Sequence, residues 1–272
     1  MIEQKIDGKI KKLPKPKVKF ELLTIEDEAK KFVNFCRNKS SGGWDWSHYV
    51  FKQHPKLKKM VEGVDEESEF YNQCREYAEA YLKENPKAIE EAKDKFEKSW
   101  GENEEEIYST LSKDFETDFP EGVSKIKARI SINPINPRYL DKWSYDVFYR
   151  ASGDRMKEIS IHEIIHFLYF KKWLEVFPNY DKKTFNGPHP EWKLSEILVN
   201  PIMNINPAIQ KILNGKQSSG YKEFQNIKID GETLNEFFGN IYREHLNEKI
   251  SFADFLKRTW GEYQQHQDLM ID

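Results

Sequence analysis

The chain has 272 residues, of which 38% are hydrophobic, 14% aromatic and 33% charged. This composition is typical of a folded protein with many surface ion pairs, and it excludes an intrinsically disordered chain. The 43 basic and 46 acidic residues give a formal net charge of −3, which argues against nucleic acid as a partner, and the two cysteines are too few for a disulfide framework.

The N-terminal segment, residues 1–20, contains several lysines and prolines and is expected to form an extended basic arm. It lacks the apolar run of about seven residues that a secretory signal peptide requires. No stretch of the chain approaches the roughly 20 apolar residues that cross a bilayer. We therefore expect a cytoplasmic protein that has neither a membrane nor a nucleic-acid partner.

A helical N-terminal region is predicted for residues 21–118. Glycine and proline interrupt its helical patterns, for example at Asn85-Pro86 and at Gly101. The acidic run 104–106 is most simply explained as helix N-terminal charge, which the helix dipole favours. The predicted helices of this region span residues 24–38, 46–62, 65–84, 86–99 and 103–115.

Two strands of a small sheet are predicted next. Residues 122–132 alternate apolar and charged side chains with a period of two, which is the pattern of a half-buried strand. Residues 142–150 are rich in β-forming residues and are followed by Ser152-Gly153. The stretch 133–137 contains two prolines and is expected to connect the strands.

Residues 159–168, which read Ile-Ser-Ile-His-Glu-Ile-Ile-His-Phe-Leu, contain the pattern H-E-x-x-H without an internal proline or glycine. On a helix, His162 and His166 lie one turn apart on one face, so both imidazoles can reach a single metal ion. Glu163 lies about 100° around the axis from His162, where it can touch a water at the metal without becoming a ligand. The apolar neighbours indicate a buried helix, in which these polar groups need partners.

A third protein ligand is required, because catalytic zinc usually has three and keeps a fourth position for water. One class of H-E-x-x-H enzymes continues with G-x-x-H, and this class is excluded because Tyr169 and Lys172 occupy those positions. The other large class uses a glutamate from a second helix downstream. The candidates in this chain are Glu175, Glu191 and Glu196.

These three glutamates differ in their surroundings. Glu175 would lie about 13 Å along the helix axis from His166, which is too far to share a metal. Glu191 follows Pro190 in a first helical turn, where the helix dipole alone explains an acidic residue. Glu196 lies in the mostly apolar helical segment 192–199, where a carboxylate is costly without a cation. Glu196 is therefore the predicted third ligand, and Glu191 is the alternative.

With these residues, segment 123–203 resembles the gluzincin-type zinc metallopeptidases of the zincin superfamily. The resemblance implies a zincin-like core in a metallopeptidase domain of residues 119–272, with Zn²⁺ as cofactor and a peptide or protein as substrate. In that family the third-ligand helix often reads E-x-x-x-D, and the aspartate bonds to the first histidine. Asn200 occupies that position here, so Asp154 or Glu158 is an alternative source of the carboxylate.

The predicted fold class is α+β and mostly helical, with the small sheet before the H-E-x-x-H helix and the helical N-terminal region before both. In zincins an edge strand of such a sheet holds a peptide substrate, although a sheet without a substrate role is equally compatible with these residues. Segment 215–225 is rich in glycine and serine and is expected to be a loop. The C-terminal helices are predicted near residues 190–203, 206–214, 231–246 and 251–266.

The predicted activity is peptide-bond hydrolysis by a zinc-activated water, with Glu163 as the general base. Gluzincins also supply a tyrosine or histidine that donates to the oxyanion; by resemblance the candidates are Tyr221, Tyr242 and His245, with His189 as a fourth. The absence of a G-x-M-E-N-like segment mildly favours an endopeptidase over an aminopeptidase.

Two other hypotheses remain open from the sequence. The first is a catalytically inactive zinc-binding module that binds a protein or peptide partner, which would need a fourth protein ligand such as His189. The second is an enzyme whose N-terminal arm lies in the cleft as an inhibitory segment.

Overall fold

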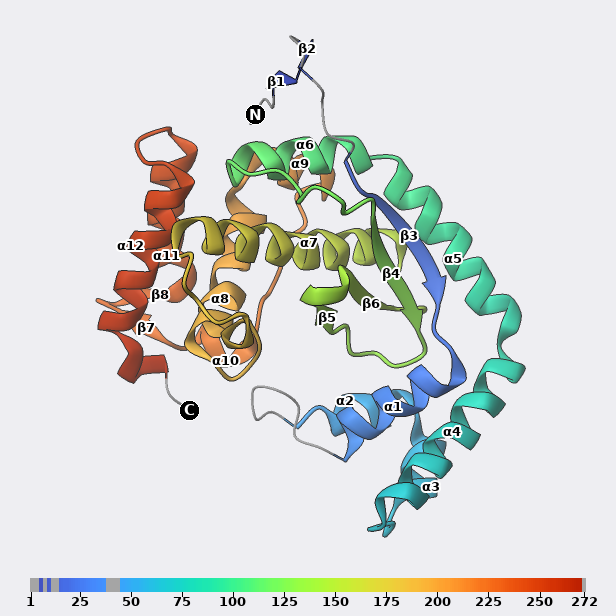
Figure 1. Cartoon of the computed structure of the whole chain (residues 1–272). Helices are drawn as coiled ribbons and strands as arrows, with labels where there is room; N and C mark the ends of the chain where they lie inside the picture. The colour runs from blue at the N-terminus through green and yellow to red at the C-terminus, as the bar shows by residue number, and fades with distance from the viewer. Residues whose placement is uncertain (1–4, 7–8, 11–14, 38–44, 271–272) are drawn as a thin grey trace. The chain divides into compact units, whose positions relative to one another are not determined.

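The computed structural model describes residues 5–6, 9–10, 15–37 and 45–270 (Figure 1). It confirms the expected class, α+β and mostly helical with a small mixed sheet. The chain forms two compact units, and neither is continuous in sequence. The sheet unit comprises Pro16–Glu102 and Ser124–Ser160, and the helical unit comprises Met1–Lys15, Asn103–Val123 and Ile161–Asp272. The boundaries expected at residues 20 and 118 stay predictions.

The sheet unit is built around four strands in the order β3-β4-β6-β5. Both predicted strands are present in this sheet, and β4 pairs in parallel with β3 and with β6, whereas β5 pairs with β6 antiparallel. β3 includes the last residues of the segment 1–20 that was expected to be an extended arm. Its alternating pattern buries Val18 and Phe20. The strand bounds are Lys17–Leu22 for β3, Lys125–Ser131 for β4, Arg138–Tyr139 for β5 and Ser144–Phe148 for β6.

In the described part of the sheet unit, β3 is followed by the helices α1 Ile25–Cys36, α2 Ser47–Gln53, α3 Pro55–Val61, α4 Glu67–Glu84 and α5 Pro86–Gly101. A single helix was expected over residues 46–62, and the structure has two, α2 and α3. The break falls at His54, whose backbone is not helical (φ −127°, ψ 63°), because the ring of Pro55 disfavours the helical conformation in the residue before it. α5 lies beside β3 (Figure 1).

A buried polar network joins α1 to the sheet. The Glu28 carboxylate accepts hydrogen bonds from the Ile132 backbone N–H (2.8 Å) and from the Ser131 hydroxyl (2.9 Å). Lys31 Nζ donates to the same hydroxyl (3.0 Å) and lies 2.9 Å from a carboxylate oxygen of Asp146. Burial raises the pKa of Glu28 to about 7, because desolvation outweighs the favourable charge of Lys31. Glu28 therefore binds a proton more tightly in the folded protein than in the unfolded chain.

Glu28 should make the stability of the protein depend on pH. A raised folded-state pKa contributes stability fully below about pH 4.5, and this contribution is lost as the pH rises through about 7. Between pH 5 and 7.5, wild type should therefore lose about 2 kcal/mol of unfolding free energy relative to Glu28→Gln, measured by urea denaturation. Glu26→Gln is the matched control, because the Glu26 side chain is 53% exposed on the same helix. Parallel pH profiles for wild type and Glu28→Gln would contradict this assignment.

The helical unit is built from α6 Glu104–Asp114, the greater part of α7 Gly153–Val176, α8 Pro190–Ile205, α9 Pro207–Ile212, α10 Lys222–Gln225, α11 Leu234–Leu246 and α12 Phe252–Gln265. α7 starts in the sheet unit and continues into this one. α11 packs on α8, and Gly239 permits their close approach, since a Cβ there would lie 2.9 Å from Ile205. The expected helix over 231–246 begins only at Leu234, because a hairpin precedes it.

The remaining elements are short. The hairpin consists of β7 Lys228–Ile229 and β8 Glu232–Thr233, and a second two-residue pair is formed by β1 Lys5–Ile6 and β2 Lys9–Ile10. Single 3-10 turns occupy Leu140–Lys142, Lys182–Phe185 and Gln267–Met270. Over the residues that the structure describes, no helix combines the length and apolar character needed to cross a bilayer.

Candidate metal centre

The H-E-x-x-H segment is helical, as predicted, and it lies inside α7. Apolar residues surround it on all sides of the helix, and Ile161, Ile164, Ile165, Phe167 and Leu168 are all buried. A helix that is apolar around its whole circumference is a core helix. Within it the His166 side chain is fully buried, whereas the His162 side chain remains 21% exposed. One imidazole therefore retains contact with solvent.

Glu196 comes from α8, the second helix of the candidate centre. α8 begins with Pro190 as its first helical residue and is buried over most of its length. The Glu196 side chain is 1% exposed. A carboxylate at this depth is costly to desolvate unless positive charge or several hydrogen-bond donors compensate it.

Three possible ligand atoms of α7 and α8 form a small triangle. His162 Nε2 and His166 Nε2 are 3.1 Å apart, and each lies 3.4 Å from Glu196 Oε2. Two ligands bound about 2.0–2.1 Å from one tetrahedral zinc ion lie about 3.3–3.4 Å apart. The spacing and the N,N,O donor set therefore fit a zinc ion that these three residues would hold.

Glu163 lies next to this triangle. Its Oε1 atom is 4.0 Å from His162 Nε2, and its side chain is nearly buried. Among the described residues, the side chains that come together as a possible metal site are those of His162, His166 and Glu196. Glu163 lies beside this group but is not part of it. A carboxylate in this place can accept a proton from a water in the centre.

The other two glutamate candidates for the third ligand lie elsewhere. Glu175 accepts a hydrogen bond from Thr117 (2.7 Å) and lies within 3.5 Å of Lys172, in a partly exposed ion-pair cluster. Glu191 is buried beside Tyr180, where burial and then the charge of Glu191 raise the pKa of that phenol. Of the three candidates, only Glu196 meets the two histidines.

Asn200, which stands where the family pattern has aspartate, takes part in a chain of side-chain amides. Its Oδ1 accepts from Asn204 Nδ2 at 2.8 Å, and its Nδ2 donates to Asn235 Oδ1 at 3.1 Å. Of the two carboxylates considered for support of a histidine, Asp154 is exposed in the first turn of α7, and Glu158 pairs with Arg155.

Two of the oxyanion candidates, Tyr242 and His245, are held by Asp114 of α6. The Tyr242 hydroxyl donates to Asp114 Oδ2 at 2.6 Å. The two ring nitrogens of His245 lie 2.8 Å from the Asp114 carbonyl oxygen and 3.2 Å from the Ile250 carbonyl oxygen. Burial lowers the pKa of His245, but the bonds and charge of Asp114 outweigh it and raise the pKa overall. These contacts tie α11 to α6 and the turn before α12.

The remaining candidates are Tyr221 and His189. Tyr221 lines a pocket together with Glu196, and its ring packs near Trp192 (6.2 Å between centroids). His189 is exposed at the start of α8 and is not part of the histidine-glutamate group. Of the four residues considered as oxyanion donors, Tyr221 is the one that shares a pocket with a candidate ligand.

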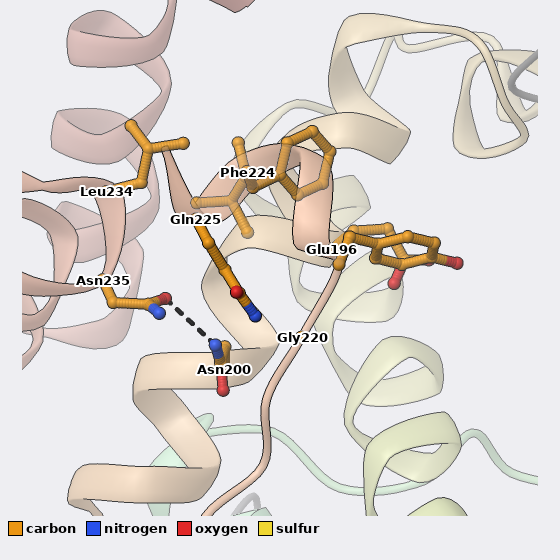
Figure 2. Close-up of a pocket in the computed structure, with 9 residues that line it drawn as sticks. Glu196, Asn200, Gly220, Phe224, Gln225, Leu234 and Asn235 are labelled. Carbon is orange, nitrogen blue, oxygen red and sulfur yellow. Dashed lines mark hydrogen bonds between the residues drawn. The ribbon is translucent and has the colours of Figure 1, made fainter. Parts of the chain in front are cut away.

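This pocket lies between α8, α10, α11 and the loop before α10 (Figure 2). Three side-chain amides gather in it, from Asn200, Gln225 and Asn235, together with apolar side chains. The sequence pattern points to Asn200 only as a partner of a histidine, and it does not point to Gln225 or Asn235 at all. No spacing signal marks these two residues, because they come from separate elements that only the fold brings together.

Comparison of the chain with known protein families, with curated proteins and with solved structures found no match. The gluzincin resemblance therefore rests on the residues of this chain, and the zincin-like core stays a prediction.

Replacing Glu196 should weaken zinc binding by at least two orders of magnitude, because the site would lose one of its three ligands and the only carboxylate among them. Zinc affinity is measured by competition with a chelating dye, and zinc content by mass spectrometry, on Glu196→Ala and wild type. Glu191→Ala is the matched control, since Glu191 is also buried on α8. If Glu191→Ala loses zinc and Glu196→Ala retains it, the third ligand has been assigned to the wrong residue.

Proposed function

We propose that the protein is a zinc-dependent metallopeptidase in which His162, His166 and Glu196 hold the metal and Glu163 is the general base. The observation that carries this proposal is the triangle of His162 Nε2, His166 Nε2 and Glu196 Oε2, whose sides of 3.1, 3.4 and 3.4 Å match ligand spacing around zinc. The H-E-x-x-H segment and its resemblance to gluzincins supply the choice of a peptide bond as substrate.

The ligand group favours a catalytic over a purely structural metal. Structural zinc sites are closed by four protein ligands, whereas catalytic sites use three and leave one position open. The described group has three members, and His189, the fourth ligand considered from sequence, lies exposed and outside it. The partial exposure of His162 supports access of solvent and substrate to the same place.

Each residue of the centre has a chemical role in this proposal. When bound, zinc would act as a Lewis acid that polarises the scissile carbonyl and lowers the pKa of water toward 7. Glu163 takes a proton from the attacking water and delivers it to the leaving amine. Tyr221 is the candidate donor to the developing oxyanion, because it lines the pocket that contains Glu196.

The decisive variant is Glu163→Gln, which keeps the shape of the side chain but removes the base. We expect peptide turnover to fall by at least 1,000-fold while zinc content and thermal stability stay at the wild-type values. Turnover is measured on a broad peptide library with zinc-loaded protein. Glu175→Gln, on the same helix but away from the centre, is the control that should retain activity.

Three outcomes separate the hypotheses. Cleavage by wild type that Glu163→Gln abolishes supports the peptidase. Full activity in Glu163→Gln would show that another group acts as the base. Zinc binding without turnover of any peptide would favour the inactive module that binds a partner.

A further inference from the structure

The pocket beside Glu196 has a chemical character of its own. Of the described side chains that line it, Glu196 is the only charged one. The other lining residues are apolar or carry neutral polar groups, among them the amides of Asn200, Gln225 and Asn235. Glu196 and Asn200 lie one turn apart on α8, so the pocket adjoins the candidate metal centre.

A chain of hydrogen bonds that begins at the Ser218 backbone fixes the orientation of the Asn235 amide. The Ser218 backbone N–H donates to Asn204 Oδ1 (2.7 Å), so the NH₂ group of Asn204 must face Asn200 Oδ1. Asn200 then has its own NH₂ group directed at Asn235 Oδ1. Because each amide accepts on one side and donates on the other, the relay ends at the NH₂ group of Asn235, for which the described residues provide no acceptor.

Gln225 is oriented in the opposite sense. Its Nε2 donates to the Ser219 backbone carbonyl at 2.8 Å. A backbone carbonyl can only accept, so Gln225 Oε1 is the group that remains for a ligand. The pocket therefore offers N–H donors at Asn235 and an oxygen acceptor at Gln225, both on neutral groups (Figure 2).

Gly220 maintains this arrangement from the loop. Its φ of +60° is a conformation that other residues adopt only with strain. A Cβ at this position would lie 2.8 Å from Asn200 Nδ2, the atom that donates to Asn235. The positive φ therefore favours glycine here, and a Cβ would in addition push the Asn200 side-chain amide aside and disturb the relay.

We propose that this pocket is a specificity subsite that binds a carboxamide side chain, glutamine or asparagine, of the peptide substrate. A carboxamide has one acceptor and one donor group and so complements both Asn235 and Gln225. A carboxylate lacks the donor, an ammonium lacks the acceptor and an aliphatic side chain lacks both, so with each of these ligands at least one of the two exposed residues, Asn235 and Gln225, keeps only water as a partner. This inference rests on the proposed peptidase function, because it assigns the substrate of the same centre.

The test uses binding, so that it does not depend on turnover. Hydroxamates chelate zinc and would place an attached side chain beside the metal. Zinc-loaded full-length protein is titrated with the hydroxamates of N-acetyl-glutamine, N-acetyl-methionine and N-acetyl-glutamate, and Kd is measured by calorimetry. We expect the glutamine compound to bind about 5- to 10-fold more tightly than the other two.

Variants locate the preference in the pocket. Asn235→Leu should reduce the preference for glutamine over methionine to less than about twofold, because it removes the donor at the end of the relay. Asn240→Leu, the same change at an exposed position of α11, should keep the preference. Gly220→Ala should weaken it in the same direction as Asn235→Leu, since both act on the relay.

The outcomes distinguish this inference from the function on which it rests. If the protein binds no zinc, both the proposed peptidase function and the proposed subsite are wrong. If zinc-loaded protein cleaves peptides but binds the three compounds equally, or binds none, only the subsite is wrong. A preference that survives Asn235→Leu would likewise overturn the subsite.

Discussion

The centre depends on one electrostatic constraint, which is the burial of the Glu196 carboxylate between two imidazoles. His166 and Glu196 are almost completely removed from water, and the surrounding residues of α7 and α8 are apolar. Apolar walls do not stabilise negative charge, so the carboxylate requires a cation at short range. Imidazole nitrogens at 3.4 Å from one carboxylate oxygen offer the lone pairs and the geometry that a divalent metal would use.

Two other buried carboxylates show how the same chain solves this problem without a metal. Asp146 has Lys31 Nζ at 2.9 Å, and Lys31 is itself buried in the sheet unit. Asp114 has His245, whose two ring nitrogens both face carbonyl oxygens and are best satisfied when the ring is protonated. In both cases the chain supplies the cation. At Glu196, two imidazole nitrogens lie 3.4 Å from one carboxylate oxygen and 3.1 Å from each other, an arrangement better suited to sharing a metal ion than to two positive charges.

The sequence predicts the arrangement of residues where the determining pattern is local. The H-E-x-x-H spacing places His162 and His166 on one helix face, and Glu196, chosen for its apolar surroundings, lies beside both imidazoles. The sequence does not predict how distant segments meet. β3 joins the sheet by pairing with β4, more than a hundred residues later, and no local pattern specifies that register. Tyr242 was chosen by residue type alone, which says nothing about its bond to Asp114.

Asn200, which stands where the gluzincin pattern would have an aspartate, has a definite place in the amide relay. An aspartate at this position could only accept hydrogen bonds, from Asn204 on one side and from Asn235 on the other. The Asn235 amide would then turn its NH₂ group toward the aspartate and present its oxygen to the pocket. The Ser218 backbone N–H sets the orientation of the Asn204 amide. This orientation reaches Asn235 only if the residue at position 200 accepts a hydrogen bond from Asn204 and donates one to Asn235. The neutral, directional lining of the pocket therefore depends on a single amide, that of Asn200, one turn from Glu196.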